Sequence, residues 1–150
     1  MERLYLDTSV FGGYFEPEFE FWTKILFEEI KKGHFKIFYS RLNNAELIYA
    51  PKEVRELITI LPQNQIEFID LTIEAENLAD LYIHEKVVGK TSRSDCMHIA
   101  LATLNNADIL ISWNFKHIVN VNRIRGYNAI NYRQGHKMLE IRTPREILEQ

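Results

Sequence analysis

The chain has 150 residues, of which 46% are hydrophobic and 12% aromatic, and its formal net charge is −3. This length fits one compact domain, over residues 1–150, and the composition excludes a disordered chain. The slight acidity excludes a protein that coats nucleic acid with a basic surface. A local patch or a bound metal ion could still meet a nucleic acid, because net charge describes general attraction rather than a site.

Cys96 is the only cysteine, which excludes a disulfide framework within the chain and a thiolate metal cluster. His98 follows two positions later, but on a helix these two side chains point in different directions, so we expect a buried structural thiol. The chain starts with a strand-like segment and no basic, apolar leader, and no apolar run approaches the ~20 residues that span a bilayer. We therefore expect a cytoplasmic protein with no membrane contact.

Short buried strands alternate with amphipathic helices along the chain. Apolar periodicity and turn residues predict strands at 3–7, 35–39, 65–69, 107–111 and 139–141. They predict helices at 19–32, 41–49, 52–60, 72–87, about 91–105 and 115–124, and a last helix from Thr143 and Pro144. Gly12, Gly13 and Pro17 indicate a loop, and Gly89 a break between two helices.

This alternation predicts an α/β fold with three layers, in which helices cover both faces of a central, mostly parallel, twisted sheet of roughly five strands. In such sheets the functional site lies beyond the carboxyl ends of the strands. Asp7 follows the first predicted strand, and Ser112 and Asn114 follow the fourth, so we expect these residues at that edge.

Polar and acidic residues gather in four places: Asp7-Thr8-Ser9, Glu46, Asp95 and Ser112-x-Asn114. Few basic residues lie beside these acids in the sequence. Carboxylates placed in this way make poor structural ion pairs but suit a hard divalent cation, and oxygen ligands favour Mg²⁺ or Mn²⁺ over zinc. The clusters therefore predict a metal site.

Each acid also has a structural interpretation. Asp7 is typical of an Asx turn or a helix cap, and Glu46 of a solvated helix position. Asp95 lies in the first turn of an apolar, alanine-rich helix, where the helix dipole favours an acid and Ser92 three residues earlier completes a capping pattern. The same position would hold a carboxylate rigidly at the sheet edge, so both interpretations of Asp95 stay open.

Taken in order, the four clusters resemble the PIN-domain family over about residues 3–135. The resemblance is greatest to the small single-domain members related to the VapC-type toxin ribonucleases of bacterial and archaeal toxin–antitoxin pairs. It implies that three or four acids gather around one or two Mg²⁺ or Mn²⁺ ions and cut RNA. It also implies a homodimer, and an antitoxin protein that inhibits the enzyme.

The resemblance assigns the first three acids to Asp7, Glu46 and Asp95, as catalytic residues and metal ligands. Asp7 and Asp95 would bind the ion directly, whereas Glu46 would bind through water or act as a base.

Three polar residues complete the match. Ser9 matches the small residue that steadies the first acid, and Ser112 the residue that positions phosphate or water. Asn114 stands where the family usually has a fourth acid. This departure implies that a second metal ion binds weakly or not at all.

Two basic residues near the clusters, Arg93 and Lys116, are candidates for holding a phosphate, with exposed solvation as the alternative. No histidine has a partner at zinc-like spacing. Four aromatic residues could stack on a base or simply pack loops over the sheet. These are Phe11, Tyr14, Phe15 and Trp113.

The function that the resemblance implies is a metal-dependent ribonuclease, the toxin of a type II pair, which hydrolyses RNA with metal-activated water. The alternative is a catalytically weak or inactive PIN-like module that binds RNA or a protein partner. Asn114 favours the alternative, whereas three retained, mutually repelling acids disfavour it. An aspartyl phosphatase is disfavoured because Ser9, not a second aspartate, follows Asp7 by two positions.

Overall fold

Five parallel strands form one sheet in the order β3-β2-β1-β4-β5. The structure is a computed structural model, which describes residues 1–86 and 92–149. The strands are β1 (Glu2–Leu6), β2 (Phe35–Ser40), β3 (Ile66–Ile69), β4 (Ile109–Ile111) and β5 (Glu140–Arg142). The predicted five-stranded parallel sheet is thus confirmed, although β4 has three residues instead of the five predicted at 107–111.

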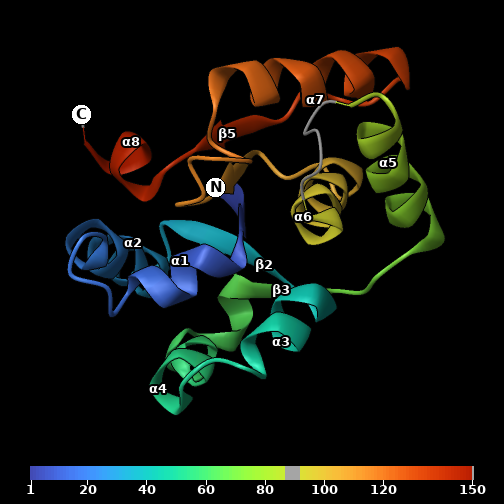
Figure 1. Cartoon of the computed structure of the whole chain (residues 1–150). Helices are drawn as coiled ribbons and strands as arrows, with labels where there is room; N and C mark the ends of the chain where they lie inside the picture. The colour runs from blue at the N-terminus through green and yellow to red at the C-terminus, as the bar shows by residue number, and fades with distance from the viewer. Residues whose placement is uncertain (87–91, 150) are drawn as a thin grey trace.

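Helices cover both faces of this sheet (Figure 1). They are α1 (Thr8–Gly13), α2 (Glu20–Lys31), α3 (Arg41–Leu47), α4 (Lys52–Arg55), α5 (Ile73–His84), α6 (Arg93–Leu104), α7 (Val121–Arg133) and α8 (Pro144–Leu148), with short 3₁₀ turns at η1 (Leu57–Ile60) and η2 (Gln63–Gln65). None of the helices in the described part of the chain has the length and apolar character needed to cross a bilayer.

The alternation of side chains along β1 divides the core into two layers. Leu4 and Leu6 pack with α1, α2 and α4 on one face, whereas Tyr5 packs with α5, α6 and α7 on the other. Because neighbouring residues of a strand point to opposite faces, one apolar run supplies both layers. The predicted three-layer arrangement is therefore confirmed.

The chain changes direction across the sheet at the junction of β1 and β4. From β1 it builds outward through β2 to β3, and then returns to place β4 on the opposite side of β1. In open parallel sheets, this kind of switch leaves a crevice beyond the carboxyl ends of the two strands. The register pairs Leu6 with Ile111, so Asp7 and Ser112 leave the sheet side by side.

The loop predicted at Gly12, Gly13 and Pro17 is wrong at the two glycines, because Thr8–Gly13 form the helix α1, but it is confirmed around Pro17, where residues 14–19 form turns and a bend. Glycine disfavours helices, but Val10 and Phe11 are completely buried, and this packing outweighs the local preference. Gly13 lies against a tryptophan: a Cβ at this position would be 2.7 Å from Cδ1 of Trp113. The glycine is thus required by a close approach rather than by a turn.

The helix predicted at 115–124 is also wrong. Residues 115–118 form turns, and the main-chain carbonyl of Asn114 accepts hydrogen bonds from the amides of Ile118 and Val119. The helix α7 begins only at Val121, where the side chain of Asn120 caps it.

Two further boundaries differ from the prediction. The expected helix at 52–60 divides into α4 and η1, and the expected helix at 41–49 ends at Leu47. The expected helix end at Val87, the break at Gly89 and the helix start at 91 fall outside the described residues.

Candidate active site

Asp7 is buried at the carboxyl end of β1, with its side chain held by two hydroxyl groups. It occupies the N-cap position of α1, yet its side chain caps no backbone amide, so the helix-cap interpretation is wrong. Instead its Oδ2 accepts hydrogen bonds from Ser9 Oγ at 2.6 Å and from Ser112 Oγ at 2.8 Å. These bonds fix the carboxylate and leave Oδ1 facing away from the two serines.

The two serines also hold the loop that follows β4. Ser9 Oγ accepts a hydrogen bond from the amide of Trp113 at 3.0 Å, and Ser112 Oγ accepts one from the amide of Asn114 at 2.9 Å. The side-chain oxygen of Asn114 in turn accepts a bond from the amide of His117 at 3.0 Å. The short sequence from Ser112 to Asn114 is therefore locked against α1.

Glu46 reaches the same edge from α3. Its Oε1 accepts hydrogen bonds from Thr8 Oγ1 at 2.7 Å and from His98 Nε2 at 2.6 Å. Burial alone would raise the pKa of this carboxyl, but the bonds from His98 and Thr8 and the charge of His98 outweigh it and lower the pKa. Glu46 is therefore an ionised, bonded residue and not a freely solvated helix position.

His98 is the residue of this site that the sequence did not single out. Its side chain is only 1% exposed, and Nε2 also lies 3.6 Å from Asp7 Oδ1. Burial would lower the pKa of the imidazole, but the hydrogen bond to Glu46 and the charges of the surrounding acids raise it. A signal was present, because His98 lies three residues after Asp95 and such pairs share one helix face.

Asp95 lies half-buried in the first turn of α6. Ser92 caps this helix as expected, but through the amide of Ser94 at 3.1 Å. Burial, followed by the negative charge of Asp7, raises the pKa of Asp95 from 3.8 to about 6, and Glu46 adds to this rise. The charge of His98 and a hydrogen bond with the Asn114 side chain act in the opposite direction. The three acids therefore share one electrostatic field.

The donor atoms fit a hard cation held mostly by water. Within residues 1–86 and 92–149, no group of three or more His, Cys, Asp or Glu side chains is arranged to hold a metal ion by itself. Glu46 is occupied by His98, which leaves Asp7 and Asp95 as the oxygen donors. This set suits Mg²⁺, which commonly keeps several waters and binds proteins through one or two carboxylates.

The remaining candidates lie around this centre. Arg93 is engaged on the surface with Asp80, with Nε 2.9 Å from Oδ1. Lys116 is exposed in the turn that follows Asn114.

Two of the four candidate aromatic residues are explained by packing. Phe11 is fully buried and meets Phe27 edge to face. Trp113 stacks on Phe19 with ring centroids 4.5 Å apart, and its Nε1 donates to Thr23 Oγ1 at 2.9 Å. Both side chains are buried, so packing accounts for them without a bound base.

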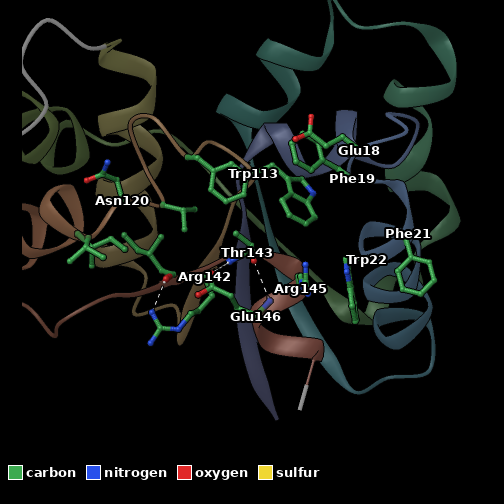
Figure 2. A pocket seen from close by; sticks show the side chains of 15 residues that line it. Glu18, Phe19, Phe21, Trp22, Trp113, Asn120, Arg142, Thr143, Arg145 and Glu146 are labelled. Carbon is green, nitrogen blue, oxygen red and sulfur yellow. Dashed lines mark hydrogen bonds between the residues drawn. The ribbon is translucent and has the colours of Figure 1, made fainter.

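An open groove of about 740 Å³ is lined in part by Trp113, the residue that follows Ser112 (Figure 2). Its lining includes Phe19, Trp22, Phe115 and Arg145. The three site acids do not line this groove.

Comparison with known proteins bears on the family and the fold of the chain. The model of the PIN domain matches residues 4–117. A search of curated proteins returned no match.

Two solved structures share the fold at low identity. The toxin–antitoxin assembly VapBC2 from Rickettsia felis, bound to a DNA fragment from its promoter, matches with 16% identity and a TM-score of 0.58 over 94% of this chain and 98% of that chain. DNA-bound VapBC from Salmonella typhimurium matches with 14% identity and a TM-score of 0.55 over 96% and 99%.

Proposed function

The chain belongs to the PIN-domain family, and from this premise we propose that it is a Mg²⁺- or Mn²⁺-dependent endoribonuclease, the toxin of a type II toxin–antitoxin pair. The observation that carries the proposal is the meeting of three acids, from the end of β1, from α3 and from α6, at one edge of the sheet. His98 Nε2 lies 2.6 Å from Glu46 Oε1 and 3.6 Å from Asp7 Oδ1, and the charges of Asp7 and Glu46 both raise the pKa of Asp95. Carboxylates that repel one another are costly, and a divalent cation bound between them would relieve the part of this cost that His98 does not offset.

Each polar residue of the site has a role in this proposal. Asp7 and Asp95 bind the ion directly, and Glu46 meets it through a water molecule or accepts a proton. Ser9 and Ser112 both keep the Asp7 carboxylate in place; the expected phosphate contact of Ser112 is not proposed, because this side chain is fully buried and its hydroxyl donates to Asp7. Asn114 would orient the phosphate or the attacking water. The ion supplies a lowered pKa of water and stabilisation of charge on the phosphate.

The neutral Asn114 favours a single strongly bound ion, because a carboxylate would be needed to offset the charge of a second. Hydrolysis by water does not require the 2′-hydroxyl, so RNA as the substrate rests on the family and not on the geometry. Arg93 and Lys116 are at most outlying phosphate contacts, since Arg93 is already paired with Asp80.

The biological role rests on the family and on the two structural neighbours, both of which are toxin–antitoxin assemblies. We propose that the chain forms a homodimer, acts in the cytoplasm on cellular RNA and is inhibited by an antitoxin. The alternative, an inactive RNA- or protein-binding module, is favoured by Asn114 alone.

A cleavage assay on single-stranded RNA decides between these functions. The wild type should cut with Mn²⁺ or Mg²⁺ and not with EDTA, and Asp7→Asn and Asp95→Asn should both lose the activity. Asp70→Asn is the matched control, because Asp70 is an exposed acid paired with Arg41 outside the site. A wild type that binds RNA but never cuts it would support the inactive module. Activity retained in both site variants would refute the assigned acids.

A further inference from the structure

Six side chains of the site, Glu46 among them, are joined by hydrogen bonds into a closed ring. They come from β1, α1, the end of β2, α3 and α6. The members are Tyr5, Thr8, Ser40, Asn43, Glu46 and His98.

One half of the ring runs from Asn43 to the acid. Asn43 Nδ2 donates to Thr8 Oγ1 at 3.0 Å, and Thr8 Oγ1 donates to Glu46 Oε1 at 2.7 Å. Asn43 is itself anchored, because its Nδ2 also donates to the main-chain oxygen of Leu6 at 3.1 Å. The orientation of Glu46 is thereby tied to the end of β1, next to Asp7.

The other half runs through the imidazole. His98 Nε2 donates to Glu46 Oε1 at 2.6 Å, and Nδ1 shares a hydrogen bond of 2.6 Å with the hydroxyl of Tyr5. The Tyr5 hydroxyl lies 2.9 Å from Ser40 Oγ, which donates to Asn43 Oδ1 at 3.0 Å and closes the ring.

The ring is largely out of reach of water. Tyr5, Ser40 and Asn43 have no exposed surface, and His98 has 1%. Inside a protein an unpaired polar group carries its full desolvation penalty, so a completed network holds its members in one arrangement. Both bonds to Glu46 end on Oε1, which leaves Oε2 to meet a water molecule at the site.

We propose that His98 is a positioning residue that fixes Glu46 in its water-mediated role, an inference that rests on the proposed function. The imidazole touches neither substrate nor ion. It aims the one acid that the ion does not bind directly, and its N–H lies between the carboxylates of Glu46 and Asp7.

Two substitutions of His98 by amides test the roles of its two imidazole nitrogens separately. In His98→Gln the side-chain amide can reach the place of Nε2 and still donate to Glu46, whereas in His98→Asn it reaches only the place of Nδ1. Loss of an outer-sphere partner typically costs 10–100-fold in activity. We expect His98→Asn to lower kcat by about this factor with little change in KM, and His98→Gln to retain most of kcat.

Controls separate positioning from general damage. His84→Asn, an exposed substitution at the end of α5, should leave kcat unchanged. In the Glu46→Gln background, His98→Asn should cause no further loss of kcat, because both substitutions remove the same interaction between His98 and Glu46. Equal losses in His98→Gln and His98→Asn, or effects that add to Glu46→Gln, would overturn the proposal.

Tyr5→Phe provides a second entry to the ring if the His98 variants fold poorly. It removes only the hydroxyl group and keeps the aromatic side chain in the core. We expect a partial loss of kcat at unchanged KM. An unchanged kcat would count against a role of the hydrogen-bond ring in positioning Glu46.

A magnetic-resonance measurement keeps this inference separate from the nuclease proposal. In ¹⁵N-histidine-labelled protein, the proton on His98 Nε2 should give a resolved signal that is lost to solvent exchange in Glu46→Ala. A wild type without nuclease activity that shows this signal would refute the function and leave the ring intact. Absence of the signal in wild type would refute the ring itself.

Discussion

Replacing Asp95 with asparagine should stabilise the ion-free protein at neutral and alkaline pH, although it should abolish cleavage. The pKa of Asp95 is raised from 3.8 to about 6, first by burial and then by Asp7. An acid with a raised folded-state pKa is favourable when protonated, so its contribution is fully present below pH 3.8 and is lost as the pH rises through about 6. At pH 8 Asp95 is ionised in the folded protein, and the full free-energy cost of this ionisation lowers the stability of the fold.

The size of this penalty follows from the pKa. One pH unit corresponds to about 1.4 kcal/mol, so the full change is equivalent to ~3 kcal/mol. Asp95 is only half-buried, and solvent screening reduces the figure to about 1–2 kcal/mol. For a chain of this length we expect the melting temperature of Asp95→Asn to rise by roughly 2–8 °C at pH 8.

Urea unfolding without divalent ions, at pH 8 and pH 4, measures this difference. The gain in Asp95→Asn should be present at pH 8 and fall to a small fraction near pH 4, where the folded-state carboxyl is protonated and the unfolded-state carboxyl is about half protonated. Asp70→Asn supplies a control of opposite sign, because the bond from Arg41 lowers the pKa of Asp70. Millimolar Mn²⁺ should stabilise the wild type and not Asp95→Asn. An equal effect at both pH values, or a loss of stability at pH 8, would refute the electrostatic reasoning.

Two further substitutions test the site loop. Gly13→Ala should lower the free energy of unfolding by roughly 1–2 kcal/mol, because the new Cβ would lie 2.7 Å from Cδ1 of Trp113 and this crowding exceeds the gain in helix propensity; a variant as stable as the wild type in urea would contradict the close approach. Asn114→Asp should raise the pKa of Asp95 further, destabilise the ion-free protein at pH 8 and increase the number of Mn²⁺ ions bound in calorimetry. Unchanged stability and stoichiometry would show that position 114 does not share the field of Asp95.

The sequence predicts the frame of this protein well because the frame follows from local patterns. The apolar runs before Asp7 and Ser112 are short, buried and followed by polar residues, which is sufficient to place both at the carboxyl end of a parallel sheet. The buried thiol is also confirmed, since Cys96 is free and inaccessible and burial raises its pKa to about 12.

The parts that the sequence did not predict depend on contacts between distant residues. The helix α1 was not predicted, because its two adjacent glycines indicate a loop and only the packing of Val10 and Phe11 makes a helix favourable there. His98 was hidden in an apolar helix, where its neighbours suggest core packing. Its partners, Tyr5 and Glu46, are 93 and 52 positions away along the chain, and no local pattern joins them.

The order of the strands has a consequence for synthesis of the chain. The central strand β1 is made first, yet one of its two neighbours, β4, emerges after residue 108 and brings the hydroxyl that holds Asp7. Polypeptides released early by the ribosome would lack Ser112 and the second edge of β1, and they could not assemble the acidic centre. The acidic centre can therefore assemble only after most of the protein has left the exit tunnel.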